Sequence, residues 1–101
     1  MMLFMVIETF KNQDAPAVYN RLKTRGRGLP KGIQYIDSWV EVSLHRCYQL
    51  MKCQDLRALQ EWVIQWNDLI EFEIVPVLTS QEAQQIATSN LKPDTGPQPN
   101  L

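Results

Sequence analysis

The sequence has few of the residues that most often build metal, redox or disulfide sites. It contains a single histidine, His45, and only two cysteines, Cys47 and Cys53. Cys47 falls in a predicted strand and Cys53 directly follows it, and on an extended chain their spacing corresponds to ~20 Å, far beyond the reach of a disulfide. No Cys-x-x-Cys pair is present. We therefore expect no metal, no cofactor and no dithiol redox site, and we expect both thiols to be small, partly buried side chains.

The sequence also lacks a long apolar run and a strong net charge. Its longest apolar stretch, residues 1–7, is far shorter than the ~20 residues of a membrane-spanning helix, and it has neither the basic start nor the cleavage site of a secretory signal. We therefore expect a cytoplasmic protein with no membrane partner. The net charge of -1 does not favour a polyanion, so no nucleic-acid partner is expected.

The sequence contains instead the pattern of a small α+β domain. Its 101 residues fit one domain with its own core. Strand-forming residues predict four strands, at residues 3–10, 33–42, 45–52 and 72–78. Asp14 and Asp55 precede two helical patterns as candidate N-caps. Thr79 and Glu82 match a capping box, which predicts a short third helix over 80–87.

The order strand, helix, strand, strand, helix, strand predicts a ferredoxin-like α+β fold. Right-handed crossovers place both main helices on one face of an antiparallel sheet with strand order 4-1-3-2. We expect a single domain over residues 1–89. Residues 90–101 contain three prolines among polar residues and are predicted to be a disordered tail.

The second and third strands are predicted to form a hairpin. A tight turn at residues 43–44 would pair Trp39 with Tyr48 and Glu41 with Arg46, and both pairs are favourable across neighbouring strands. The two turn residues are not a preferred turn sequence, so a longer loop stays open as the alternative.

Alternation along each strand divides the side chains between the two faces of the sheet. The face under the helices is predicted to carry Leu3, Met5, Ile7, Ile36, Val40, Cys47, Met51, Ile74 and Leu78. The bare face is predicted to carry Phe4, Val6, Glu8, Tyr35, Asp37, Trp39, Tyr48, Glu73, Val75 and Val77. Gln49 fits badly, because it falls under the helices without a visible partner. A bare apolar face needs a cover, and the simplest cover is a second copy, so we expect a homodimer.

Several stretches resemble an uncharacterised family of small bacterial domains. They are LFMVIE (3–8), RGRGLP (25–30), SWVE (38–41), RCYQLM (46–51), WNDL (66–69) and FEIVPV (72–77). That family looks like a member of the dimeric α+β barrel superfamily. The resemblance covers roughly residues 2–82 and leaves out the tail.

The resemblance implies ferredoxin-like subunits that pair into a barrel, with a ligand cleft between the sheet and its helices or within the barrel. The superfamily includes small enzymes, several of which act without a metal or organic cofactor. Examples are monooxygenases of antibiotic biosynthesis, muconolactone isomerases and chlorite dismutases. The uncharacterised family has no established catalytic residues to carry over, so the resemblance implies a dimer and a pocket but no particular reaction.

Two carboxylates and three aromatic residues are the candidate site residues. Glu8 is the strongest candidate for acid–base catalysis, because burial in an apolar pocket raises a carboxyl pKa. Glu73 is a second candidate, and the alternative for both is a solvated or ion-paired carboxylate. Tyr35, Trp39 and Tyr48 are candidate ligand-binding residues, because aromatic rings offer a flat wall to a ligand. Their alternative role is packing in a dimer interface.

Other polar and aromatic residues have simpler interpretations. Residues 21–31 carry five basic side chains, which either hold a phosphate or acidic partner or complement a helix C-terminus. His45 is expected to be an exposed turn residue. Trp62 and Trp66 fall on the apolar stripe of the second helix and are expected to pack in the core.

These features leave two functions open and do not decide whether the protein is an enzyme. The first is a homodimeric barrel that binds a small organic ligand in or beside the barrel and acts on it without a metal. The second is a non-catalytic protein-interaction or regulatory module. An RNA-recognition domain is disfavoured because the third strand lacks its signature, and a metal carrier because no paired cysteines follow the first strand.

Overall fold

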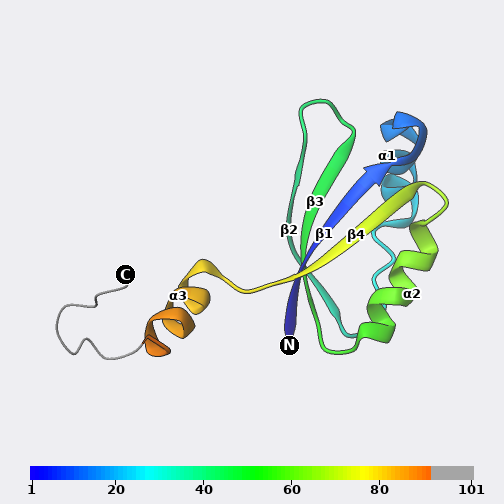
Figure 1. Ribbon diagram of the computed structural model, residues 1–101. Helices are drawn as coiled ribbons and strands as arrows, with labels where there is room; N and C mark the ends of the chain where they lie inside the picture. Colours follow the sequence, from blue (N-terminus) through cyan, green and yellow to red (C-terminus); the bar gives the residue numbers. More distant parts are fainter. Residues whose placement is uncertain (92–101) are drawn as a thin grey trace.

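Four antiparallel strands form one twisted sheet in the computed structural model, which describes residues 1–91 (Figure 1). The central strand β1 (Met2–Phe10) lies between β3 (Arg46–Cys53) and β4 (Ile70–Val77), and β2 (Ile33–Val40) pairs with the other side of β3. The sheet order is β2-β3-β1-β4, so the predicted ferredoxin-like topology is confirmed. Most of the predicted tail, residues 92–101, lies outside the described residues.

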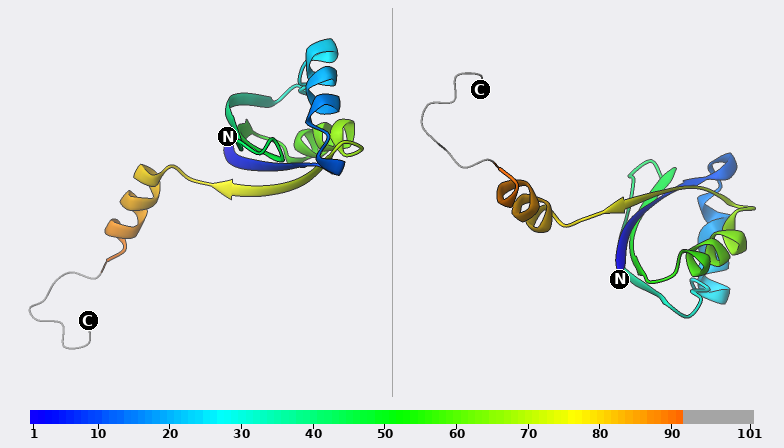
Figure 2. Two further views of the ribbon diagram at one scale, coloured as in Figure 1. Left: turned by 90° about the horizontal axis from the view of Figure 1, so that it is seen from above. Right: turned by 60° about the horizontal axis from the view of Figure 1, so that its bottom comes forward.

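Two helices cover one face of this sheet. A short 3-10 turn, η1 (Lys11–Gln13), leads from β1 into α1 (Ala15–Arg25), and α2 (Leu56–Trp66) connects β3 to β4. Both helices lie on the same side of the curved sheet (Figure 2). The core lies between them and the sheet, where buried aromatic, aliphatic and sulfur side chains form one cluster.

The predicted caps fix where the helices begin. The Asp14 carboxylate accepts a hydrogen bond from the backbone N–H of Ala17 at 3.1 Å, and the Asp55 carboxylate accepts one from that of Arg57 at 2.9 Å. Each bond satisfies a backbone donor that the first helical turn leaves free. At the other end of α1, Gly26 adopts a φ of 69°, a conformation that favours glycine.

The hairpin of β2 and β3 has the predicted pairing. Trp39 lies opposite Tyr48, and the backbone N–H of Glu41 donates to the carbonyl of Arg46 at 2.9 Å. The side chains of Glu41 and Arg46 also form an ion pair at 2.9 Å. The connection runs over residues 41–45, so the longer loop, and not the tight turn, joins the strands.

The predicted faces of β1 are wrong. Phe4, Val6, Glu8 and Phe10 are buried under the helices, whereas Leu3, Met5 and Ile7 lie on the open face and are only partly buried. Alternation could not decide between the two arrangements, because residues 2–7 are apolar at every position. Glu8 is the only charged residue in the strand, and a charged side chain is expected on the open face. It lies on the buried face instead, so it favoured the wrong assignment.

A β-bulge reverses the predicted face of Tyr35. The register of β2 against β3 shifts between Tyr35 and Asp37, so the intervening Ile36 has no partner across the ladder. Tyr35 therefore packs against the core under the helices, while Trp39 stays on the open face with 51% of its surface exposed. Ile36 itself is exposed and does not contribute to the core.

The third helix, α3 (Ser80–Ser89), projects away from the domain (Figures 1 and 2). Its predicted capping box is confirmed, since Thr79 and Glu82 exchange side-chain to backbone hydrogen bonds at 3.1 and 3.4 Å. None of its residues is buried, and the described part of the chain extends over 62 Å along its longest axis. No helix in this part of the chain is long and apolar enough to span a membrane.

The face assignment of β1 can be tested with two neighbouring alanine substitutions. Phe4→Ala should lower the free energy of unfolding by about 3–5 kcal/mol, because it empties space in the core. Met5→Ala, on the open face, should cost only about 1 kcal/mol. Urea denaturation of dilute protein measures both values. A larger loss for Met5→Ala than for Phe4→Ala would show that β1 has the opposite face in the core.

Candidate functional site

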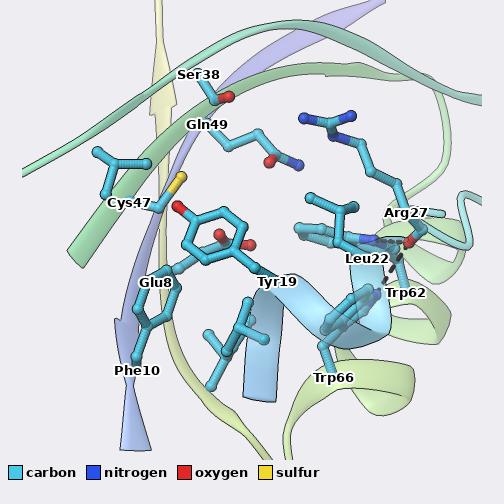
Figure 3. Close-up of a pocket in the computed structure, with 13 residues that line it drawn as sticks. Glu8, Phe10, Tyr19, Leu22, Arg27, Ser38, Cys47, Gln49, Trp62 and Trp66 are labelled. Carbon is cyan, nitrogen blue, oxygen red and sulfur yellow. Dashed lines mark hydrogen bonds between the residues drawn. The ribbon is translucent and has the colours of Figure 1, made fainter. Parts of the chain in front are cut away.

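A cavity of about 90 Å³ lies between the covered face of the sheet and the two main helices. Polar side chains from β1, β2, β3, α1 and the α1–β2 loop reach it, and apolar side chains from both helices and the strands form its walls (Figure 3). The polar lining residues are Glu8, Tyr19, Arg27, Ser38, Cys47 and Gln49. Such a mixture of mostly apolar walls and a few convergent polar groups is typical of small-molecule sites.

Glu8 is the central polar group of this cavity. The register of β1 places it between Cys47 of β3 and Phe72 of β4, and only 6% of its surface is exposed. Burial raises the pKa of its carboxyl from 4.5 to about 7, although the hydrogen bond with Cys47 and the charge of Arg27 oppose the rise. At neutral pH the side chain is therefore close to half protonated, which suits a group that exchanges protons.

Cys47 lies beside Glu8 but is unsuited to act as a nucleophile. Burial, followed by the charge of Glu8 and the hydrogen bond with it, raises the pKa of the Cys47 thiol to about 12. The thiolate is the reactive form of cysteine, and it is scarcely populated at neutral pH with such a pKa. The thiol is instead a neutral neighbour of Glu8 across the β1–β3 ladder. Cys47 and Cys53 are both free and buried, as predicted.

Gln49 and Ser38 add neutral polar groups to the cavity. Gln49 is 5% exposed, and its amide donates to the Met51 sulfur at 3.2 Å, a weak acceptor that leaves most of the hydrogen-bonding capacity of the amide unused. The Ser38 hydroxyl and the Tyr35 hydroxyl share a hydrogen bond of 2.7 Å. Tyr19 from α1 also lines the cavity, and burial is the largest cause that raises the pKa of its phenol.

Two tryptophans fix the loop that closes one side of the cavity. The indole N–H groups of Trp62 and Trp66 both donate to the backbone carbonyl of Arg27, at 3.0 and 2.9 Å. Both indoles lie in the core, as their helical spacing predicted, and both also line the cavity. The α1–β2 loop is thereby tied to α2, and the side chain of Arg27 is brought to the cavity.

The two candidate carboxylates lie on opposite faces of the sheet. Glu73 pairs with Ile7, is exposed and belongs to the open face, whereas Glu8 faces the cavity. They therefore do not form a carboxylate pair. The three candidate aromatic residues are divided in the same way: Tyr35 lies on the covered face, and Trp39 and Tyr48 are neighbours on the open face.

The remaining candidates have structural roles. Arg21 forms a two-pronged ion pair with Asp68 at 2.8 and 2.6 Å, which joins α1 to the α2–β4 connection, and only Arg27 of the basic residues at 21–31 reaches the cavity. The backbone carbonyl of His45, in the β2–β3 loop, accepts a hydrogen bond from Phe10 at 2.9 Å. Within residues 1–91 no group of three or more potential metal ligands occurs.

Sequence reasoning missed Arg27, Ser38, Tyr19 and Cys47 as cavity residues. The one available signal was Gln49, a polar residue that the alternation of β3 places under the helices. The residues that lie beside Gln49 on the neighbouring strands would have been the correct place to search for a site. Arg27 could not have been found in this way, because a loop and not a strand carries it.

Comparison with known proteins gives a family and no activity. Residues 2–91 match the family model described as "Domain of unknown function (DUF3303)". The chain belongs to this family. The match to the DUF3303 model extends to residue 91 and includes all of α3, whereas the resemblance noted in the sequence ends near residue 82. No curated protein and no solved structure matches the chain. The function of this DUF3303 domain must therefore be inferred from its own residues.

The titration of Glu8 predicts how stability depends on pH. The folded protein holds the Glu8 proton more tightly than the unfolded chain, since the pKa rises from 4.5 to about 7. The contribution of Glu8 to stability is therefore full below pH 4.5 and declines as the pH rises to about 7. At ~1.4 kcal/mol per pKa unit, the loss amounts to about 3 kcal/mol. Glu8→Gln keeps the size of the side chain but does not titrate, so it should lack this loss.

Urea denaturation of both proteins across this pH range measures the effect. The difference in unfolding free energy between Glu8→Gln and the wild type should grow in favour of the variant between pH 4.5 and about 7, and then stay constant. Glu61→Gln, at an exposed position of α2 away from the open face, is the matched control for removing one carboxylate. Parallel curves for the wild type and Glu8→Gln would contradict a raised pKa.

Proposed function

We propose that this protein binds a small organic molecule in the cavity beside the sheet, and that Glu8 exchanges a proton with it. The observation that carries the proposal is a buried carboxyl with a pKa of about 7 in a cavity with mostly apolar walls. Such a group is costly to a fold, because burial without a charged partner disfavours its ionised form. Perturbed carboxyls in cavities are characteristic of functional sites.

The surroundings of Glu8 support a functional role over a structural one. No ion pair in the described part of the chain includes Glu8, and its neighbour across the β1–β3 ladder is the neutral Cys47 thiol. A structural carboxylate would be expected to have an arginine or several backbone N–H groups as partners, which lower the pKa. Near pH 7, Glu8 can instead act both as acid and as base toward a ligand.

Three tryptophans provide a direct test of ligand binding. Trp62 and Trp66 line the cavity, whereas Trp39 lies on the open face. A screen of small organic fragments should therefore yield compounds that shift the indole N–H resonances of Trp62 and Trp66 in NMR spectra and leave that of Trp39 in place. Leu22→Phe, which fills the cavity from α1, should abolish the shifts in an otherwise native spectrum.

Two outcomes would contradict the proposed site. Fragments that shift only the Trp39 resonance would place the ligand on the open face, where Trp39 and Tyr48 were candidate ligand-binding residues. A fragment screen with no shift at either cavity tryptophan would leave no support for a ligand. The non-catalytic interaction module would then be the better account of the protein.

We propose, in addition, that two copies pair through their open sheet faces into a barrel. The open face carries the partly buried apolar side chains of Leu3, Met5, Ile7 and Leu50, with Trp39 beside them. Soluble monomers rarely expose a contiguous apolar surface of this kind. A second copy is its natural cover, because a two-fold axis brings the same surface of both subunits together.

The position of α3 is consistent with this pairing. Ala83, Ile86 and Ala87 are spaced to form one apolar stripe on a helix that buries none of its residues. A groove lined by residues of the open face, including Leu3 and Val77, continues to Ala83 of α3. A partner packed on the open face would therefore be in reach of α3 as well, and one two-fold contact would cover both surfaces.

The oligomeric state tests the pairing. Sedimentation velocity of the wild type at micromolar concentration should show about 24 kDa, twice the 11.8 kDa of one chain. Ile7→Asp on the open face and Ile86→Asp on α3 should each weaken the dimer by about tenfold or more, since each puts a charge into the interface. Ile64→Asp, at an exposed position of α2, is the matched control and should leave the dimer intact. A folded wild type that sediments only as a monomer would contradict the pairing.

A further inference from the structure

Arg27 is held at the edge of the cavity by its own backbone. Its carbonyl accepts both tryptophan N–H groups of α2, and the glycines on either side of it have positive φ angles, 69° at Gly26 and 66° at Gly28. A Cβ atom at Gly28 would approach the side-chain oxygen of Gln65 to 2.4 Å. The Gly-Arg-Gly sequence therefore lets the loop lie close to α2 and turn the Arg27 side chain back over the sheet.

The guanidinium of Arg27 has a stacking partner but an unsatisfied donor. Its central carbon lies 3.7 Å from the centre of the Tyr35 ring, a cation–π contact that orients the planar group. Its Nε–H is buried and has no hydrogen-bond partner among the described residues. None of the ion pairs in this part of the chain includes Arg27. The Nε–H is out of reach of a ligand in the cavity, but the two terminal nitrogens of Arg27 are not buried and have no hydrogen-bond partner among the described residues, so they are the donors that a ligand can use.

The chemistry around the guanidinium selects the acceptor. Arginine prefers the two coplanar oxygens of a carboxylate, which match its fork of N–H donors. The Gln49 side chain extends toward Arg27 across the cavity and offers a further amide (Figure 3). A cationic ligand would face the charge of Arg27, and a neutral one would leave that charge without a counterion. The cavity of about 90 Å³ also restricts the ligand to a small molecule.

We propose that the ligand of this cavity is a small organic acid, bound with its carboxylate on the Arg27 guanidinium and its carbon skeleton between the tryptophans and Glu8. This inference rests on the proposed function, because it names the chemical class of the molecule in the same cavity. Arg27 anchors the acid, Trp62 and Trp66 supply an apolar wall, and Glu8 faces the part of the ligand that is not held by Arg27. Arg27 is thus a binding residue, and Glu8 is the group that exchanges the proton.

Three probes of nearly equal shape and different charge test this class: butyrate, butyramide and butylammonium. Titration of each into the wild-type protein at neutral pH, followed at the indole resonances of Trp62 and Trp66, gives their affinities. Butyrate should bind about 10- to 100-fold more tightly than butyramide, which is the range expected for hydrogen bonds to a charged group. Butylammonium should bind more weakly than either.

Variants of two neighbouring arginines separate binding from a general loss of charge. Arg27→Gln should lower the affinity for butyrate to that for butyramide, and Arg27→Lys should restore part of the difference. Arg25→Gln is the matched control, since it removes the same charge from an exposed position in the last turn of α1. Arg25→Gln should leave the affinities for all three probes unchanged. The Trp39 resonance reports whether each variant keeps the native fold.

The outcomes distinguish this inference from the proposed function. If butyramide binds as tightly as butyrate and shifts the same two indoles, the cavity binds ligands, but the proposal that its ligand is an organic acid is wrong. A preference for butyrate that persists unchanged in Arg27→Gln would also overturn the inference. If none of the three probes shifts the indole resonance of Trp62 or Trp66 up to its solubility limit, both the organic-acid ligand and the proposed cavity site are contradicted.

Discussion

The register of β1 is the constraint on which the rest of this structure depends. This strand lies in the middle of the sheet and is hydrogen-bonded along its length to β3 and β4. Its register places Phe4 and Val6 in the core and, on the same face, Glu8 in the cavity. A slip of one residue would exchange the two faces, so that Glu8 would reach water and the open face would lose Leu3, Met5 and Ile7. The core, the cavity and the apolar open face are therefore set together.

The side chains around Glu8 do not neutralise it. The carboxyl lies beside a thiol that itself favours the protonated form, and Arg27, whose charge acts on Glu8, is stacked on Tyr35 and forms no ion pair with it. An unpaired cation and a carboxyl in one small, mostly apolar cavity lower the stability of the fold unless a bound group pairs with the cation. A bound organic acid would give Arg27 its counterion and place a carbon skeleton against Glu8. The same arrangement accounts for a guanidinium that lines the cavity and forms no ion pair within residues 1–91.

The fold could be predicted from the sequence because it depends on local signals that agree. Asp14, Asp55 and Thr79 mark the helix starts, and the pairs Trp39–Tyr48 and Glu41–Arg46 define one hairpin. With right-handed crossovers, the order of these elements is compatible with one order of strands in the sheet. The faces of β1 could not be predicted, because its alternation is hidden by apolar residues on both sides. Tyr35 was misplaced because a single-residue bulge is invisible in a short strand pattern.

The candidate site was predictable only in part. Glu8 stood out because it is the one charged residue in an apolar strand, and Gln49 because it is polar at a buried position. Arg27 depends on the path of a loop, which two glycines and two indole hydrogen bonds determine. Contacts of that kind join residues far apart in the chain, and no spacing in the sequence encodes them.

The most direct measurement of the central claim is a titration of the Glu8 carboxyl carbon by NMR in the isotope-labelled protein. The account predicts a midpoint near pH 7, because burial under α1 and α2 raises the pKa of this group. The Glu8→Gln variant assigns the signal, because it lacks the Glu8 carboxyl resonance. A midpoint for Glu8 close to 4.5, the ordinary value, would show that the carboxyl is in water, and it would contradict both the register of β1 and the cavity built on it.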